Sequence, residues 1–158
     1  MEDYIAALAD FGKTMGLPEL APDEKGYCCL QFDKKNTVHL QYQPEEDQLI
    51  IFIQLDFVDS NHQLSVYQML LEGNFFNADN NGATLSVQPG NDAVFLTQMI
   101  VKERLTFAFE KTLENFMNAV DYWSAKIDEA NNLDEGKDVD EGEEEMEGVS
   151  ENESFFKA

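Results

Sequence analysis

The sequence is poor in cysteine and in long apolar runs, and each shortage excludes a class of protein. Only two of its 158 residues are cysteines, Cys28 and Cys29. Neighbouring side chains in a strand point to opposite faces, so these two thiols are not placed to pair with each other. Without a disulfide framework, a reducing, cytoplasmic environment is favoured. No apolar run approaches the ~20 residues of a membrane span, and the acidic start MEDYIAALADFG lacks the basic region of a signal peptide.

Basic residues are also scarce. The chain has 32 Asp and Glu against 10 Lys and Arg, which gives a formal net charge of −22. Nucleic-acid binding needs a basic stripe that neutralises phosphates, and docking on anionic membranes needs a similar cluster. We therefore expect neither a nucleic acid nor a membrane as partner. High negative charge favours solubility, which suits a protein that handles poorly soluble partners.

Residues that could carry chemistry are few. His39 and His62 are the only histidines, and Cys28-Cys29 offers no CxxC spacing for zinc. A Cys/His nucleophilic pair is possible on paper, but no sequence feature activates either thiol. Asn77-x-Asp79-x-Asn81-Gly82 resembles the first half of a calcium loop, yet Gln88 stands where a bidentate Glu belongs, so a polar turn is the better interpretation. We predict no catalytic residue, no metal site and no cofactor.

Apolar periodicity predicts three helices and five strands. The predicted elements, in chain order, are a helix from Asp3 (its cap) to about Met15, strands over 27–32, 38–42 and 49–57, a helix that begins at Asp59-Ser60-Asn61 and ends at Asn74, strands around 85–87 and 94–96, and a helix over 105–127. The expected apolar stripes are Ile5, Leu8, Phe11 or Gly12, and Met15 in the first helix, Leu64, Tyr67, Leu70 and Leu71 in the second, and Leu105, Phe109, Leu113, Phe116, Val120, Trp123 and Ile127 in the last.

The third strand is apolar on both faces at its start. Leu49, Ile51, Ile53, Leu55 and Phe57 alternate onto one face. Ile50 and Phe52 lie on the other face, so that face should be covered as well. The cover could be a helix of the same chain, a twin subunit or a bound client protein.

The composition changes after about Leu133. Residues 134–153 contain eleven Asp and Glu against the single Lys137. Such a segment buries too little apolar surface to offset its ordering entropy. We therefore predict a folded domain over 1–133 and a disordered acidic tail over 134–158. Phe155-Phe156 at its end is either a short docking spot or a frayed terminus.

The order and motifs of the central stretch resemble one known family. The motifs are Leu70-Leu71-Glu72-x-Asn74 closing the second helix, Gly82-Ala83-Thr84-Leu85 opening the fourth strand, Val94-x-Leu96 in the fifth, and Leu105, Phe109, Leu113, Phe116 and Trp123 in the last helix. Together they resemble the class I type III secretion chaperones, the Tir-chaperone or CesT-like group. The resemblance covers roughly residues 3–130, and the acidic tail departs from it.

The resemblance implies an α+β fold of order α-β-β-β-α-β-β-α, with an antiparallel twisted sheet flanked by helices. It implies a cytoplasmic bacterial homodimer, not an enzyme, which binds the N-terminal region of a secreted effector in extended form; the secretion apparatus ATPase is a further candidate partner. The residues expected to contact the effector are Leu8, Phe11, Ile50 and Phe52. The residues expected at the dimer interface are Tyr67, Leu70, Leu71, Leu85 and Val87.

Two other functions stay open from the sequence. A regulatory decoy of the same fold would sequester a secretion regulator through the same kind of surface. A small enzyme would need Cys29 or His39 for turnover, and no acid, base and nucleophile set supports it.

Overall fold

The computed structural model describes residues 1–77 and 80–132, which form a five-stranded sheet with helices. In chain order, the elements are α1 (Glu2–Met15), β1 (Tyr27–Phe32), β2 (Asn36–Gln43), β3 (Gln48–Phe57), α2 (Gln63–Asn74), the short 3-10 helix η1 (Phe75–Asn77), β4 (Thr84–Val87), β5 (Ala93–Val101) and α3 (Lys102–Asn131). The predicted α+β class and the predicted order of elements are confirmed. No helix within the described ranges is long and apolar enough to cross a membrane.

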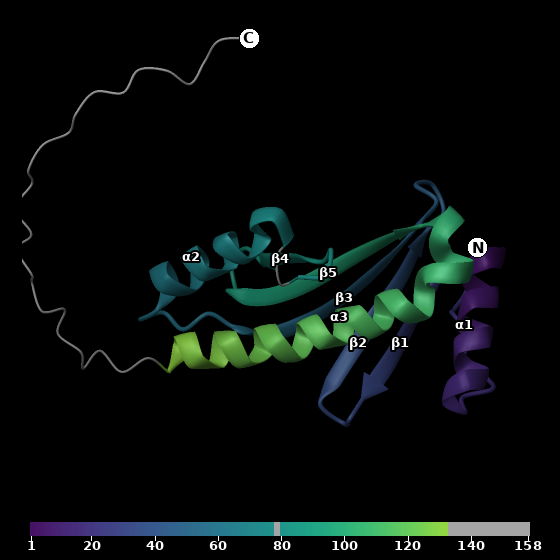
Figure 1. The fold of residues 1–158 in the computed structure, drawn as a ribbon, viewed down its shortest axis with the longest axis horizontal. Helices are drawn as coiled ribbons and strands as arrows, with labels where there is room; N and C mark the ends of the chain where they lie inside the picture. Colours follow the sequence, from purple (N-terminus) through teal and green to yellow (C-terminus); the bar gives the residue numbers. More distant parts are fainter. Residues whose placement is uncertain (78–79, 133–158) are drawn as a thin grey trace, which may run out of the picture.

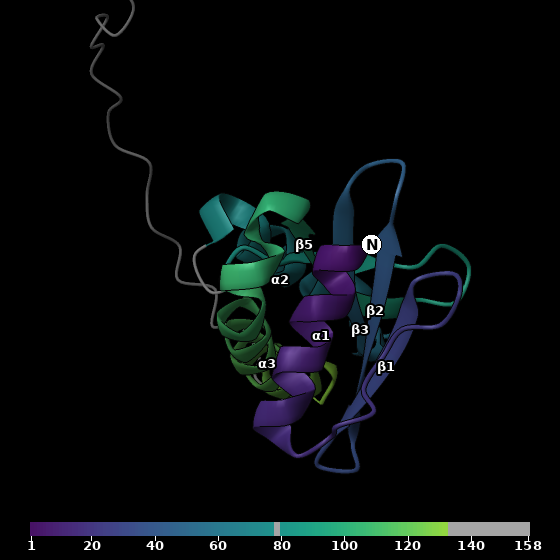
Figure 2. The same ribbon diagram turned by 90° about the vertical axis from the view of Figure 1, so that its right-hand side faces the viewer.

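The sheet is antiparallel throughout, in the order β1-β2-β3-β5-β4. Tight polar turns join β1 to β2 and β2 to β3. Along the chain, α2 follows β3 and precedes the β4–β5 hairpin. The long α3 crosses one face of the sheet beside α1, and α2 lies next to β4 (Figure 1). Seen from the side, α1 and α3 lie on one side of β1, β2 and β3, and no helix is drawn on the other side (Figure 2).

The core lies between this sheet face and the helices. In β3, Leu49, Ile51 and Ile53 are buried against α3, as their alternation predicts. All seven apolar positions of the predicted α3 stripe are buried, from Leu105 to Ile127. Burial of this stripe removes each large side chain from water, which contributes about 1.5–3 kcal/mol per residue as an upper estimate.

The buried stripe of α1 differs from the prediction by one residue. Tyr4, fully buried, stacks on Tyr42 of β2 with ring centroids 5.6 Å apart, whereas Ile5 and Met15 are exposed. One residue turns a helix by about 100°, so the change from Ile5 to Tyr4 moves the buried side at the N-terminal end, while the last turn around Met15 is exposed. Asp3 lies inside the first turn and makes no capping hydrogen bond, so its prediction as the cap is wrong.

The start of α2 and the end of β3 also differ from the prediction. Asp59 and Asn61 form a turn in which the Asp59 carboxylate accepts from the Asn61 backbone N–H at 2.8 Å. The helix therefore begins at Gln63, and Leu64 is exposed instead of buried. In β3 the register shifts between Gln54 and Asp56, and this irregularity leaves Phe57 exposed.

Some predictions fall outside the described residues. The acidic tail over 134–158 and residue Asp79 of the calcium-like motif are among them. A strand, β4, follows that motif, in line with a polar turn. A calcium loop of the kind considered is followed by a helix.

Candidate protein-binding surfaces

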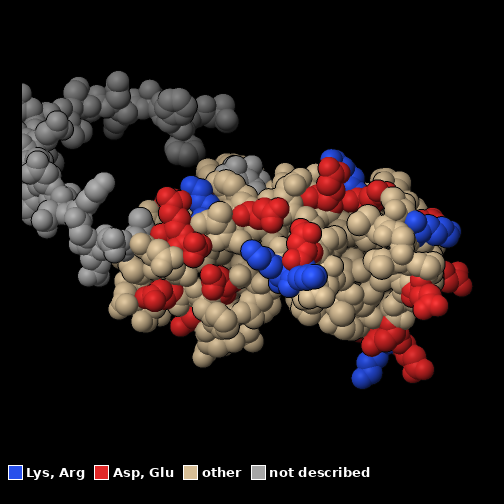
Figure 3. Space-filling view, turned by 90° about the horizontal axis from the view of Figure 1, so that it is seen from below, with Lys and Arg blue, Asp and Glu red and all other residues tan. Residues whose placement is uncertain are grey.

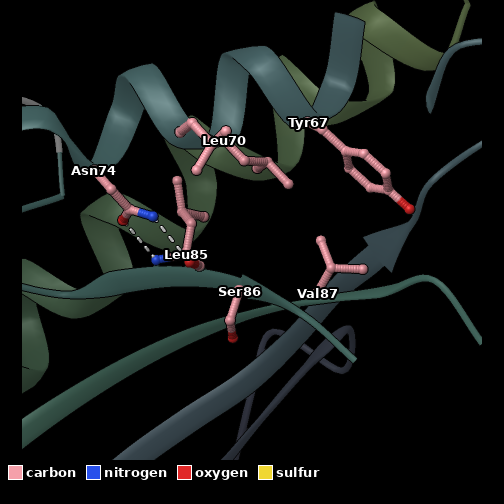
Figure 4. Close-up of a pocket in the computed structure, with 7 residues that line it drawn as sticks. Tyr67, Leu70, Asn74, Leu85, Ser86 and Val87 are labelled. Atoms are coloured by element: carbon pink, nitrogen blue, oxygen red, sulfur yellow. Dashed lines mark hydrogen bonds between the residues drawn. The ribbon is translucent and has the colours of Figure 1, made fainter. Parts of the chain in front are cut away.

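An apolar groove runs between α2 and β4. It has a volume of about 310 Å³ and is lined by Tyr67, Leu70, Leu71, Asn74, Leu85, Ser86 and Val87. Figure 4 shows the side chains of Tyr67, Leu70, Leu85 and Val87 between the helix and the strand, with that of Ser86 pointing away from α2. All five residues predicted at a dimer interface line this groove.

Asn74 ties the end of α2 to the edge of the sheet. Its Nδ2 donates to the carbonyl oxygen of Leu85 at 2.9 Å, and its Oδ1 accepts from the Leu85 backbone N–H at 2.9 Å (Figure 4). Asn80 donates a further hydrogen bond to Asn74 Oδ1 at 3.1 Å. The Asn side chain thus satisfies the outward backbone groups of an edge strand, which a second strand would otherwise use.

Two more contacts fix the walls of this groove. The Tyr67 hydroxyl donates to the Asp92 carboxylate at 2.9 Å, and this hydrogen bond raises the pKa of Tyr67. At Gly73, an added Cβ would come within 2.3 Å of Cη2 of Trp123, so only glycine permits this approach of α2 to α3. Leu71, by contrast, is 72% exposed although it lines the groove.

The sheet face opposite the helices carries a row of stacked rings. His39 of β2 stacks on Phe52 of β3 with centroids 5.0 Å apart, and on Tyr27 of β1 with centroids 6.0 Å apart. The Tyr27 hydroxyl is hydrogen-bonded to His39 Nδ1 at 2.7 Å. Ile50 and Met99 are cross-strand partners on the same face, with Ile50 half-buried and Met99 exposed. This open face is therefore a partly apolar surface that the chain's own helices leave uncovered.

The two edges of the sheet differ. At β1, the Tyr27 backbone faces away from β2, because its N–H donates to the Asp23 carboxylate and its carbonyl accepts from the Asp23 N–H. Backbone groups alternate in direction along an antiparallel strand, so those of Cys29 and Gln31 face outward too. Across the described ranges, the one group that reaches either of them is the Cys28 thiol, 3.9 Å from the Cys29 carbonyl oxygen.

A second groove lies beside this open edge. It has a volume of about 550 Å³ and is lined by residues 16–20 together with Cys29, Leu30 and Gln31. Residues 16–20 form one wall of this groove, and they pass close to Gly12 of α1. A Cβ added at Gly12 would come 2.5 Å from the Leu17 carbonyl oxygen, so glycine permits this approach. Gly16 ends α1 in the left-handed conformation, with φ 71°, which glycine adopts readily at the end of a helix.

The predicted effector-contact residues divide into two pairs. Ile50 and Phe52 lie on the open face and are partly accessible, and their contact with an effector stays a prediction. Leu8 and Phe11, also predicted to contact the effector, lie in the core: Leu8 is fully buried, and Phe11 packs edge-on against Phe109 of α3 with centroids 5.7 Å apart. Buried rings and methyl groups are not available to a partner while the core is intact.

The two residues that an enzyme would need, Cys29 and His39, lie on neighbouring strands. Cys29 and His39 are direct cross-strand partners, although His39 Nδ1 is already bonded to Tyr27. The described residues include no cluster of three or more His, Cys, Asp or Glu side chains that could hold a metal ion. Acidic side chains outnumber basic ones on the face shown in Figure 3, and the two kinds are interspersed.

Comparison with known proteins gives one family match. Residues 6–124 match the Tir chaperone protein (CesT) family. No curated protein sequence matches the chain.

Solved structures with the same fold are found in protein complexes. A chain of the ExsC–ExsE complex superposes with a TM-score of 0.68 at 22% identity, covering 80% of this chain and 94% of that one. A chain of the HopA1–SchA chaperone–effector complex gives 0.63 at 23%, with 80% and 94% covered. The Yersinia pestis type III secretion chaperone SycH, in complex with a fragment of YscM2, gives 0.62 at 18%, with 78% and 98% covered. At these identities the likeness establishes the shared fold.

Proposed function

We infer the function from the family: the chain belongs to the Tir chaperone protein (CesT) family and is a type III secretion chaperone that binds effector proteins. We propose that it holds the N-terminal region of one cognate effector in extended form and keeps that effector soluble and ready for export. The family is a class of non-catalytic chaperones, and we propose that this chain likewise catalyses no reaction and acts in the bacterial cytoplasm.

The observation that carries this proposal is the pairing of an open sheet face with an open strand edge. The outward backbone groups of Cys29 and Gln31 can accept an added strand, and the groove beside them can take its side chains. Ile50, Phe52 and Met99 offer apolar contact on the adjoining face. An effector segment bound here is ordered only on binding, so it needs a large wrapped area to offset the lost entropy.

The closed edge at β4 supports a different role for the α2 side of the molecule. Asn74 already occupies the outward groups of Leu85, so an added strand finds no free pair at that residue of the short β4. The neighbouring groove is apolar and lined by Tyr67, Leu70, Leu71, Leu85 and Val87. We assign it to the homodimer, because a second copy can cover it without strand pairing. The secretion apparatus ATPase stays a predicted partner without an assigned surface.

The test is amide hydrogen exchange of the chain alone and bound to the N-terminal segment of its effector. We expect the exchange of the Cys29 and Gln31 amides to slow at least about tenfold on binding, because an added strand would engage them. The Leu85 amide, already bonded to Asn74, is the internal control and should not change. Protection at α2 without any at β1 would contradict strand addition. A folded regulator bound whole, and never exported, would favour the decoy instead.

A further inference from the structure

Two adjacent phenylalanines project from the end of α2 into solvent. Phe75 is 69% exposed and Phe76 is 87% exposed, and their rings meet edge to face with centroids 4.5 Å apart. Phe76 has φ 54° and ψ 17°, a left-handed conformation that is unfavourable for a bulky residue. An exposed aromatic residue held in a costly backbone conformation points to a binding role, since neither burial nor backbone preference explains it.

This aromatic pair continues directly from the α2–β4 groove. Asn74, the last residue of α2, lines the groove, and the pair begins at the next residue. Leu71 also lines the groove, and it precedes Phe75 by four residues, which places both on one side of the helix. A projecting apolar group and an apolar hollow therefore lie side by side.

Charge indicates what covers this surface. Residues 60–91 contain only Glu72 and Asp79 as charged side chains and no Lys or Arg, whereas 27% of the whole chain is charged. Each copy carries a formal net charge of −22, so two copies repel through most of their surfaces. The α2–β4 side is therefore one of the surfaces through which they meet with little like-charge repulsion.

We propose that the Phe75–Phe76 pair of each copy inserts into the α2–β4 groove of a second copy. A two-fold interface is self-complementary, so it needs the projecting group and the hollow on the same patch of each subunit. Both are present here, and two equivalent insertions form per dimer. The inference rests on the proposed homodimer and names the contact that specifies it.

Because Phe76 has a left-handed backbone conformation, a substitution there can weaken dimerisation without weakening the fold. Phe76→Gly removes the ring and also relieves the left-handed strain, so the monomer is expected to be as stable as before. Combined with Phe75→Ser it deletes the projecting pair. Leu71→Glu, at an exposed helix position, instead places a charge in the groove. Phe107→Ser removes a similarly exposed ring, 74% accessible, from α3 and is the matched control.

The experiment is sedimentation equilibrium of the full chain at fixed salt, with circular dichroism to confirm folding. We expect the Phe75→Ser/Phe76→Gly variant and the Leu71→Glu variant each to weaken dimerisation at least about tenfold. Phe107→Ser should change it by less than about twofold. When the first two variants are mixed, a heterodimer should form more tightly than either homodimer, because one intact insertion is restored.

The outcomes separate this inference from the chaperone function. If the wild type dimerises and the double variant dimerises equally well, the insertion is wrong and the chaperone function stands. If both variants are weakened but no heterodimer forms on mixing, the pair and the groove do not meet, and the inference is again overturned. A wild-type chain that stays monomeric would overturn the proposed homodimer as well, while effector binding is measured separately by hydrogen exchange.

Discussion

The side chain of Asn74 binds the backbone of Leu85 as a neighbouring strand would, with one hydrogen bond donated and one accepted, both 2.9 Å long. The chain's own α2 therefore closes the β4 edge at Leu85, and the β1 edge at Cys29 and Gln31 stays open. We therefore expect a partner that adds a strand to bind at β1. We expect a partner that binds through side-chain packing to use the α2 side.

Asn74→Ala is predicted to destabilise the fold by about 1–3 kcal/mol, because it leaves the N–H and the carbonyl of Leu85 without their partner. Urea unfolding at neutral pH measures the change. Asn118→Ala, at an exposed position of α3, is the control and should have an effect near zero. An unchanged midpoint for Asn74→Ala would mean that water replaces the side chain at no cost.

Gly73→Ala is predicted to lower stability by about 1–3 kcal/mol, because the new methyl group collides with Trp123. Helix propensity alone predicts the opposite sign, a gain of about 1 kcal/mol for alanine over glycine. Thermal unfolding therefore separates the two effects by sign. A stabilised variant would show that Trp123 moves aside freely.

Phe52→Asp is predicted to weaken effector binding by about 10- to 100-fold while the chain stays folded, because Phe52 is partly exposed on the open face. Gln54→Asp introduces the same charge farther along the strand, at an exposed residue, and is the matched control. Titration calorimetry with the effector's N-terminal segment measures the affinity. Equal losses for the two variants would point to charge alone rather than to the Phe52 ring.

Leu8→Asp is predicted to unfold the chain instead of acting on effector binding, because Leu8 is fully buried. An unpaired carboxylate in this core costs more than the net stability of a small domain can readily absorb. Circular dichroism detects the loss of structure. A folded Leu8→Asp variant with weakened effector binding would return Leu8 to the effector-contact surface.

Stability at acidic pH should depend on Asp47. A hydrogen bond from Tyr42 and the nearby charge of Lys102 lower the pKa of Asp47. A lowered folded-state pKa contributes stability above the ordinary pKa of the carboxyl, and this contribution is lost as pH falls through the folded-state value. The stability difference between the wild type and Asp47→Asn should therefore shrink as pH is lowered from about 7 to about 3. A difference that persists in acid would contradict the assignment.

The sequence predicted the elements that depend on local periodicity. The α3 stripe from Leu105 to Ile127 and the alternation of Leu49, Ile51 and Ile53 in β3 are confirmed because each is set by spacing along one segment. The one-residue error in α1 arose because Tyr4 and Ile5 are both acceptable core residues. Only the position of Tyr42 across the core decides between them.

The candidate surfaces are formed by residues far apart in the chain, and a single sequence does not show which distant residues come together in the fold. The stacking of Tyr27, His39 and Phe52 follows from the strand register. The groove next to β1 follows from how the loop after α1 returns to the sheet. The sequence did contain a signal for one missed feature, the uncharged, aromatic end of α2 at Phe75-Phe76, in an otherwise acidic chain.

The measurement that tests the central claim most directly is an affinity pull-down of the tagged full chain from its native host, followed by limited proteolysis and mass spectrometry. We predict a protected N-terminal segment of one larger protein, at about half the molar amount of this chain if a dimer binds one effector. A partner retained whole as a folded, protease-resistant protein would contradict the binding of an extended segment.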